Sequence, residues 1–291
     1  MSSEPILNDK LRELAAQSDK PFVRDSEKMI KYLLQVEPTL PMRYGWRVIA
    51  PEDFRKQLKS LPSPKEVNRL YWTYMARNIE AYDVILIWRS MGLLKTALHS
   101  LNAGEIVSSA VLSRSILELA VTGIINSNMI YDAVQKVTEV LKTHDHRVLV
   151  VSKELEDFIA RMLFGTRMGE PPEPFKQRNI LTYMQHLLDN LKKNNPENPA
   201  VTELMPVYEN LCEFTHPNLL GNIRFWAGIE TKSEDGSEIW RIERKAESEL
   251  TSLFQEDILW ALGWSAVCIR NAFEIGQNAV LMLTQLFREN I

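Results

Sequence analysis

Residues 106–126, with the sequence IVSSAVLSRSILELAVTGIIN, decide the fold class of this chain. As a helix, this stretch would carry apolar side chains around most of its circumference, which is typical of a helix buried inside a bundle. The residues Asn102 to Glu105 ahead of it include Gly104 and mark where the helix begins. The pattern therefore predicts an all-α protein, an antiparallel helical bundle in which this stretch is the long central helix.

Helical periodicity continues on both sides of the central stretch. Before it, Ser63-Pro64-Lys65-Glu66 combines a capping box with a proline at the first helical position, so a helix is expected from there to about residue 100. After it, apolar spacing of the helical kind predicts helices at about 129–143, 148–164, 179–193, 200–215 and 247–289. The last of these contains no proline and is expected to form a long C-terminal helix.

Two segments of the chain break the helical pattern. Residues 165–178 contain two glycines and three prolines, which predicts a loop of a length that is often mobile or functional. Residues 222–244 alternate apolar and other residues on both sides of an Asp-Gly pair at 235–236. This alternation around a turn predicts one β-hairpin, inserted before the final helix.

The first 62 residues differ from the rest of the chain because they contain few periodic apolar positions. Short helices are expected there at about 7–17, 25–36 and 51–60, separated by prolines and a glycine. We expect residues 1–62 to be an irregular N-terminal extension that packs on the body. Residues 63–291 are then expected to form a single helical-bundle domain.

Composition and charge argue against several classes of protein. The 291 residues carry 34 basic and 38 acidic side chains, a net charge of -4, so bulk charge does not favour nucleic acid or an anionic membrane. The most apolar stretches, 79–98 and 258–287, contain charged residues, which does not fit a membrane span. Two widely separated cysteines, Cys212 and Cys268, predict buried, reduced thiols in a cytoplasmic protein with no membrane partner.

A polar seam runs along the predicted central helix. Arg114, Glu118, Thr122 and Asn126 are spaced four residues apart, so in a helix they lie nearly above one another. In one interpretation Arg114 and Glu118 neutralise each other and fix the register of neighbouring helices. In the other, the seam lines a cleft where Arg114 holds an anion and Glu118 orients it or acts as a base.

The predicted C-terminal helix repeats this arrangement. Arg270, Glu274 and Asn278 are also four residues apart and lie in apolar surroundings. Two long helices that each carry an Arg-x-x-x-Glu pair suggest a polar layer inside the bundle. In that layer Arg270 and Glu274 are expected to support the first pair.

The segment from Tyr208 to Asn218 supplies a further candidate. Its helix is expected to end near His216, because Pro217 cannot donate a backbone N–H. A histidine titrates near neutral pH and can act as acid, base or ligand, with Asn218 as polar support beside it. The alternative is a structural histidine that caps the last carbonyl groups of the helix.

No cofactor and no metal ion are expected from the sequence. It contains no phosphate-binding GxxxxGKS/T loop, no GxGxxG turn after a strand and no GxSxG elbow. His144 and His146 are the only closely spaced histidines, and side chains two residues apart converge on one ion only in a loop. Since no other ligand lies at a recognisable spacing, the pair does not predict a metal site.

These residues carry a resemblance to two groups of helical proteins. Arg114 and Glu118 fit the Arg-Ser-x-Leu-Glu-Leu helix of a set of uncharacterised helical-bundle proteins. The same proteins contain a segment Tyr-x-x-Leu-x-Glu/Ser-x-x-His-Pro, which this chain matches at Tyr208, Leu211, Glu213, His216 and Pro217. Together the two matches cover about a third of the chain.

More distantly, the chain resembles the HEPN superfamily of helical bundles, many of which are ribonucleases of toxin and defence systems. The HEPN nuclease motif places an arginine shortly before its histidine. Residues 209–212, which precede His216 here, contain no arginine. The resemblance therefore implies that Arg114 supplies the missing charge from another helix.

Two functions are therefore expected to compete. The first is a soluble interaction or binding protein of a defence or stress system, whose C-terminal helix forms a homodimer or other homo-oligomer, or docks a protein partner. The second is a HEPN-like ribonuclease or nucleotide-binding protein. In it Arg114 binds the phosphate of RNA or a nucleotide, His216 acts as acid or base, and Glu118 orients both. The distance between Arg114 and His216 separates the two hypotheses.

Overall fold

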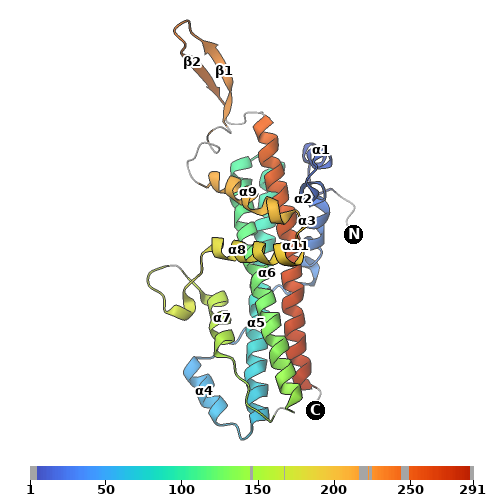
Figure 1. The fold of residues 1–291 in the computed structure, drawn as a ribbon, viewed down its shortest axis with the longest axis vertical. Helices are drawn as coiled ribbons and strands as arrows, with labels where there is room; N and C mark the ends of the chain where they lie inside the picture. The colour runs from blue at the N-terminus through green and yellow to red at the C-terminus, as the bar shows by residue number, and fades with distance from the viewer. Residues whose placement is uncertain are drawn as a thin grey trace. The chain divides into compact units, whose positions relative to one another are not determined.

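The computed structural model describes residues 5–144, 147–166, 168–215, 222, 225–243 and 249–288. Within these residues the chain forms ten α-helices and one two-stranded antiparallel sheet (Figure 1). The predicted fold class, an all-α bundle with long central and C-terminal helices and one inserted β-hairpin, is confirmed.

The helices lie close to the positions that sequence periodicity predicts. The N-terminal helices are α1 (Asp9–Gln17), α2 (Pro21–Arg24), α3 (Ser26–Leu34) and α4 (Pro51–Lys59). The three long helices are α5 (Pro64–Asn102), α6 (Ile106–Thr143) and α11 (Glu249–Arg288). Between them lie α7 (Lys153–Phe164), α8 (Ile180–Asn194) and α9 (Ala200–Glu213), with short 3-10 turns η1 (Glu37–Thr39) and η2 (Glu173–Phe175).

Helix α6 corrects one expectation. The two helices predicted at 106–126 and 129–143 form a single helix, Ile106–Thr143. The residues at the expected break, Ser127 and Asn128, include neither proline nor glycine, so the backbone hydrogen bonds continue through them. Ser127 is itself fully buried, which shows that packing does not stop at this point.

The starts of α5 and α7 follow from their capping residues. The backbone N–H of Glu66 donates to Ser63 Oγ at 3.3 Å, and the Ser63 hydroxyl donates to Glu66 Oε2 at 3.0 Å. The capping interaction predicted for this segment is therefore present. Ser152 caps α7 in the same way by accepting from the N–H of Leu155 at 3.2 Å, which satisfies one of the free donors of the first turn.

The hairpin consists of β1 (Trp226–Lys232) and β2 (Glu238–Ile242). The strands pair antiparallel with Ile229 opposite Trp240. Gly236 in the turn has a φ of 84°, a left-handed conformation that glycine adopts without strain. The Asp-Gly turn in the sequence therefore predicted the hairpin for the correct physical reason.

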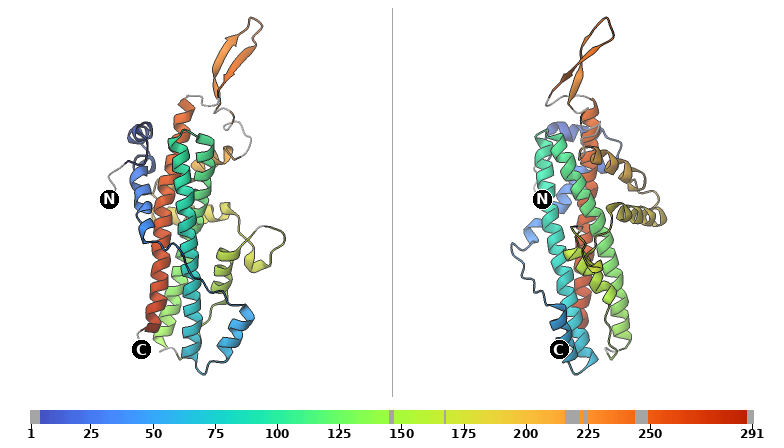
Figure 2. Two further views of the ribbon diagram at one scale, coloured as in Figure 1. Left: turned by 180° about the vertical axis from the view of Figure 1, so that it is seen from behind. Right: turned by 90° about the vertical axis from the view of Figure 1, so that its left-hand side faces the viewer.

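The chain divides into two compact units. The first unit comprises Met1–Glu37, Arg89–Val121 and Met184–Cys268, and the second comprises Pro38–Trp88, Thr122–Tyr183 and Ile269–Ile291. Helices α5, α6 and α11 contribute residues to both units, and within each unit their segments lie side by side (Figures 1 and 2). The expected division into an extension at 1–62 and one domain at 63–291 stays a prediction.

The core of the first unit is built around tryptophans of α11. Trp260 stacks on Trp264 with ring centroids 5.6 Å apart, and Phe22 meets the edge of Trp260 at 5.5 Å. The indole N–H of Trp260 donates to Glu203 Oε2 at 2.5 Å, so this buried ring keeps a polar partner. A Cβ at Gly263 would lie 2.8 Å from the carbonyl oxygen of Phe22, so glycine permits this close approach.

The second unit has its own apolar core, formed by buried residues of α4, α5, α6, α7 and α11. Side chains of α5 also fix the chain at residues 148–152. The Asn68 amide donates to the carbonyl of Val148 at 2.7 Å and accepts from the N–H of Val150 at 2.9 Å. The Trp72 indole donates to the Val150 carbonyl at 3.0 Å. These contacts hold the entrance to α7 against α5.

Helix α6 contains one window that is long and apolar enough to cross a membrane, with a mean hydropathy of 1.4 and half of its residues buried. The core helix of a soluble protein has the same length and composition. The cytoplasmic location inferred from the sequence stays a prediction.

Candidate functional site

A polar cluster joins α6 and α9 within the first unit. Helix α6 contributes Arg114 and Glu118, one turn apart, while α9 contributes Tyr208 and Cys212. Thr215 lies two residues after the end of α9. We call these five residues the Arg114 cluster. Spacings of four and three residues bring Tyr208, Cys212 and Thr215 to one side of their segment, which faces Arg114.

The guanidinium group of Arg114 connects the two helices. Its Nη1 donates to Thr215 Oγ1 at 2.7 Å, and its Nη2 lies 3.4 Å from the hydroxyl of Tyr208. Its Nε lies 3.1 Å from Glu118 Oε1 in an ion pair, although the geometry of that N–H is not that of a hydrogen bond. Thr215 donates in turn to the carbonyl of Cys212 at 2.7 Å. Arg114 therefore meets a carboxylate on its Nε side and neutral hydroxyls on its Nη side.

Tyr208 holds both charged partners in place. Its hydroxyl donates to Glu118 Oε1 at 3.1 Å, and Arg114 Cζ lies 5.5 Å from the centre of its ring. A cation near an aromatic ring at this distance is attracted by the negative face of the ring. Tyr208 thus orients Glu118 through its hydroxyl and Arg114 through its ring.

The protonation states in the cluster follow from its burial. Burial raises the pKa of Tyr208 to about 12, with the Glu118 charge in the same direction and Arg114 opposing it. Burial also raises the pKa of Cys212 above its usual value, against the effect of Arg114. Burial alone would lower the pKa of Arg114, but the Tyr208 hydrogen bond and the Glu118 charge raise it. At neutral pH the cluster therefore holds a phenol, a thiol and a permanent cation.

The cluster is suited to binding an anion. Arg114 has a side-chain exposure of 25% and Glu118 of 33%, so both are half-buried and still reach solvent. A partly desolvated guanidinium binds phosphate or carboxylate more strongly than an exposed one, because less water screens the charge. A protonated phenol and a protonated thiol are weak nucleophiles, so these five residues favour binding over covalent chemistry.

Two of the predicted site residues, His216 and Asn218, lie outside the described residues. Arg114 and Glu118 do come together as predicted, with 3.1 Å between Nε and Oε1. Thr215, which Arg114 contacts, is the residue immediately before His216 in the chain.

The second predicted pair lies in the other unit. Arg270 Nε donates to Glu274 Oε1 at 2.5 Å, so this Arg-x-x-x-Glu pair also forms. Farther along the seam of α6, the Asn126 amide belongs to that unit too and donates to the Tyr82 hydroxyl at 3.2 Å. The polar layer predicted from the two pairs stays a prediction.

The prediction of the site missed Tyr208, Cys212 and Thr215 as functional side chains. The sequence indicates Tyr208 only as part of the segment that carries a resemblance. The signal that could have found all three is their spacing, because residues four and three apart on a helix face the same neighbour. Cys212 and Cys268 are both free cysteines of intermediate residue exposure, and burial raises the pKa of each thiol.

A metal centre has no counterpart in the described part of the chain. No group of three or more His, Cys, Asp or Glu side chains there is arranged to hold an ion. Of the suspected pair, His144 is described, whereas Asp145 and His146 are not.

Comparison with family models, with curated proteins and with solved structures finds no match to this chain.

Proposed function

We propose that this chain is a binding protein that takes a phosphate-bearing ligand, RNA or a nucleotide, at the Arg114 cluster. The observation that carries the proposal is the set of partners that the Arg114 guanidinium contacts. Glu118 occupies its Nε side, and the partners of Nη1 and Nη2 are the neutral hydroxyls of Thr215 and Tyr208.

The Nη edge of Arg114 keeps its capacity to bind. Each Nη nitrogen carries two N–H groups, and among the described residues each has one hydrogen-bond partner. The remaining two N–H groups match the paired oxygens of a phosphate in a two-pronged interaction. Thr215 and Tyr208 carry no charge, so Glu118 is the acidic member of the cluster that a phosphate would compete with for Arg114.

The overall charge of -4 makes a local site necessary for such a ligand. A protein of this charge has no general attraction for a polyanion, so affinity must come from a few oriented groups. Glu118 contacts Arg114 at Nε and accepts the Tyr208 hydroxyl, so it helps to fix the direction of the guanidinium while the hydrogen bonds of Nη1 and Nη2 go to Thr215 and Tyr208.

Fluorescence anisotropy with a labelled single-stranded RNA and with a fluorescent ATP analogue tests the proposal. Arg114→Gln removes the charge-assisted hydrogen bonds and is expected to weaken binding about ten- to hundredfold. Arg114→Lys keeps the charge without the two-pronged geometry, so its affinity should fall between those of wild type and Arg114→Gln. The matched control is Arg270→Gln, which alters the equivalent pair in the other unit and should change affinity by less than about twofold. Equal affinities of wild type and Arg114→Gln for both probes would end the proposal.

A HEPN-like ribonuclease is the alternative, favoured by the contact between Arg114 and Thr215 directly before His216. The same preparations distinguish it, since binding needs Arg114 whereas cleavage would also need an acid or base. If wild type cleaves the RNA and His216→Ala binds but does not cleave, the activity is catalytic. If wild type binds the RNA and leaves it intact, the function is binding alone.

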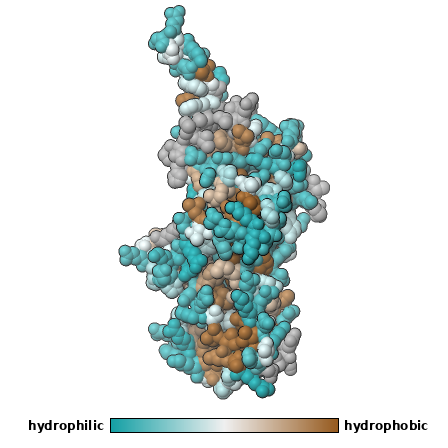
Figure 3. All heavy atoms as spheres, in the orientation of Figure 1, coloured by the Kyte–Doolittle hydropathy of each residue, from teal (hydrophilic) through white to brown (hydrophobic). Residues whose placement is uncertain are grey.

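A protein partner or a second copy of the chain is a further candidate, favoured by the hairpin. Ile239, Trp240 and Ile242 of β2 are 56%, 45% and 68% exposed, and apolar side chains are visible on the hairpin in Figure 3. Exposed apolar residues beside the free edges of a two-stranded sheet are typical of a docking surface. Light scattering measures the oligomeric state directly. If the chain is a monomer at every concentration, a second copy is excluded as the partner and a different protein is the remaining candidate.

A further inference from the structure

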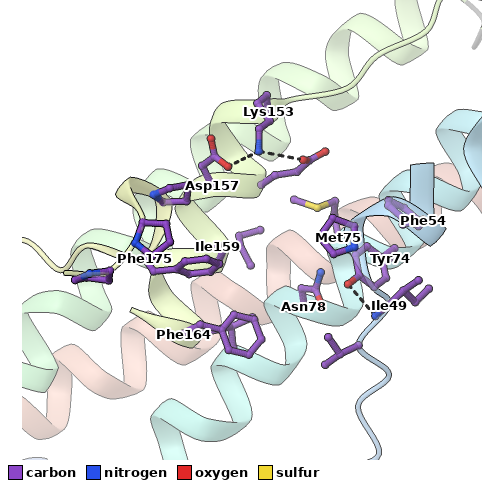
Figure 4. A pocket seen from close by; sticks show the side chains of 18 of the residues that line it. Ile49, Phe54, Tyr74, Met75, Asn78, Lys153, Asp157, Ile159, Phe164 and Phe175 are labelled. Atoms are coloured by element: carbon purple, nitrogen blue, oxygen red, sulfur yellow. Dashed lines mark hydrogen bonds and ion pairs between the residues drawn. The ribbon is translucent and has the colours of Figure 1, made fainter. Parts of the chain in front are cut away.

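The second unit contains an apolar pocket of about 850 Å³. Its walls come from residues 46–58, from α5, from α7 and from the loop at 166–175, all within this unit (Figure 4). This volume lies in the range of pockets that hold small molecules.

Five aromatic side chains line the pocket. They are Trp46, Phe54, Tyr74, Phe164 and Phe175. Trp46 stacks on Phe164 with ring centroids 5.5 Å apart and 20° between the planes, and Phe164 meets Phe175 at 6.5 Å. Flat rings arranged in this way favour a flat, aromatic ligand, which can add to the stack or meet a ring at its edge.

One polar side chain deep in the pocket, Asn78, has an unused donor. Asn78 is only 8% exposed, and its Oδ1 accepts the indole N–H of Trp46 at 2.9 Å. An indole N–H can only donate, so this bond fixes which end of the amide is oxygen. Among the described residues the amide nitrogen has no hydrogen-bond partner, and Asn78 projects from α5 into the space shown in Figure 4.

The remaining N–H groups of this amide face the open space of the pocket, where they can donate to an acceptor on a ligand. The hydroxyl of Tyr74, which accepts the backbone N–H of Ile49 at 3.4 Å, is the second polar group in the same wall (Figure 4). A carbonyl oxygen of a ligand is the simplest acceptor that fits beside these groups.

The charges at the rim favour a neutral ligand. The lining includes the basic Arg55 and Lys153 and three acidic residues, and Lys153 pairs with the carboxylates of Glu156 and Asp157. The rim therefore offers no excess of positive charge to an anion. The interior is apolar, which penalises an ion of either sign.

We propose that this pocket binds a small, neutral, aromatic molecule that accepts a hydrogen bond from Asn78 through a carbonyl group. The site lies in the other unit from the Arg114 cluster, so the proposal does not depend on the function assigned to that cluster.

The experiment uses two fluorescent probes with the full chain. Prodan is a neutral naphthalene with one ketone and one dimethylamino group, and dimethylaminonaphthalene has the same ring system without the ketone. Wild type is expected to bind prodan with a blue shift of its emission, about three- to tenfold more tightly than the probe without the ketone. Absence of prodan binding to wild type would overturn the proposal.

Variants then test the role of the amide. Asn78→Leu keeps the size of the side chain but removes the donor, so the preference for the ketone should disappear. Asn78→Asp retains an acceptor for Trp46 and replaces the free donor with an acceptor, so it should also lose the preference. A preference that survives in a folded Asn78→Leu or Asn78→Asp variant would overturn the assignment to Asn78.

Two controls separate this role from a structural one. Trp46→Phe removes the indole donor but keeps an aromatic ring and the amide of Asn78, so the ketone preference should remain within about twofold. Ala160→Phe fills the pocket from α7 without changing Asn78, and both probes should then lose their affinity. Unchanged binding of both probes in Ala160→Phe would show that they bind elsewhere, contrary to the proposal.

Discussion

Among the described residues each compact unit buries one aspartate, and the two differ in their partners. Asp257 in the first unit accepts from the Asn210 amide at 2.8 Å and lies 3.6 Å from Lys20 Nζ. Asp83 in the second unit accepts from the Gln277 amide at 3.3 Å, while its Oδ1 has no hydrogen bond among the described residues.

This difference in partners acts on the pKa of each aspartate. Burial raises the pKa of Asp257, but Asn210 and Lys20 act against it. Burial raises the pKa of Asp83 well above its usual value, and the charge of Glu80 adds to the rise against the Gln277 hydrogen bond. A nearby cation favours the charged form of a buried acid and so opposes the rise of its pKa, whereas a buried acid without a cation lacks this effect.

The largest effect is expected from the glycine that makes room for Asp83. A Cβ at Gly276 would lie 2.3 Å from both carboxyl oxygens, in a buried site where Asp83 cannot move into solvent. Gly276→Ala should therefore reduce the free energy of unfolding by about 1–3 kcal/mol, as overpacking does. Chemical denaturation measures the change.

Gly92 provides the matched control for this substitution, because it is also helical but a Cβ added there would meet no atom within 4 Å. Gly92→Ala should be neutral or stabilising by up to about 1 kcal/mol. The double variant with Asp83→Ala should recover most of the loss at Gly276. If the two alanine substitutions behaved alike, the close contact with Asp83 would be refuted.

A smaller effect is expected at the partnered aspartate. Asp257→Ala leaves the amide of Asn210 without its acceptor and removes the carboxylate near Lys20, which should cost about 1–2 kcal/mol at neutral pH. Glu256→Ala is the control, since this neighbour approaches Lys20 only to 3.8 Å at a more exposed position and should cost less than about 1 kcal/mol. Thermal or denaturant unfolding of wild type, Asp257→Ala and Glu256→Ala provides the comparison. Equal losses of stability in the two variants would contradict the role given to Asp257.

Asp83→Asn is expected to have the smallest effect on the free energy of unfolding at low pH. This effect should grow as the pH rises. Because the folded-state pKa of Asp83 is raised, its contribution to stability is full below the unfolded value of about 3.8 and is lost as the pH rises through the folded pKa. Near pH 4 the variant and wild type should differ by less than about 1 kcal/mol. Above it, wild type should lose stability relative to the variant. Parallel curves of unfolding free energy against pH would show that Asp83 ionises freely.

The fold was largely predictable because its signals are local. The capping box at Ser63, the Asp-Gly turn at residues 235–236 and the helical spacing of apolar residues each act over a few positions. The boundary expected near residue 127 was wrong because a change in the apolar pattern does not by itself end a helix. Neither proline nor glycine interrupts the backbone there.

The site was predictable only in part because its contacts are not local. Arg114 and Glu118 follow from a four-residue spacing on one helix, but Thr215 reaches Arg114 across 101 positions. Asn78 is harder still, since its unused donor is apparent only once Trp46 is placed against its oxygen. The spacing of polar and apolar residues along a helix does not indicate which polar side chain has a donor without a partner.

The hairpin has a consequence for hydrogen exchange. All five residues of β2 are exposed, and two strands alone give a sheet little cooperative stability. Its amides should therefore exchange through openings that cost little free energy. The amides in the buried turns of α6 should exchange only through openings that cost more free energy. Any molecule that pairs with a strand edge would slow exchange at β1 and β2 before it altered any helix. Amide exchange in the hairpin therefore reports whether a partner has bound at a strand edge.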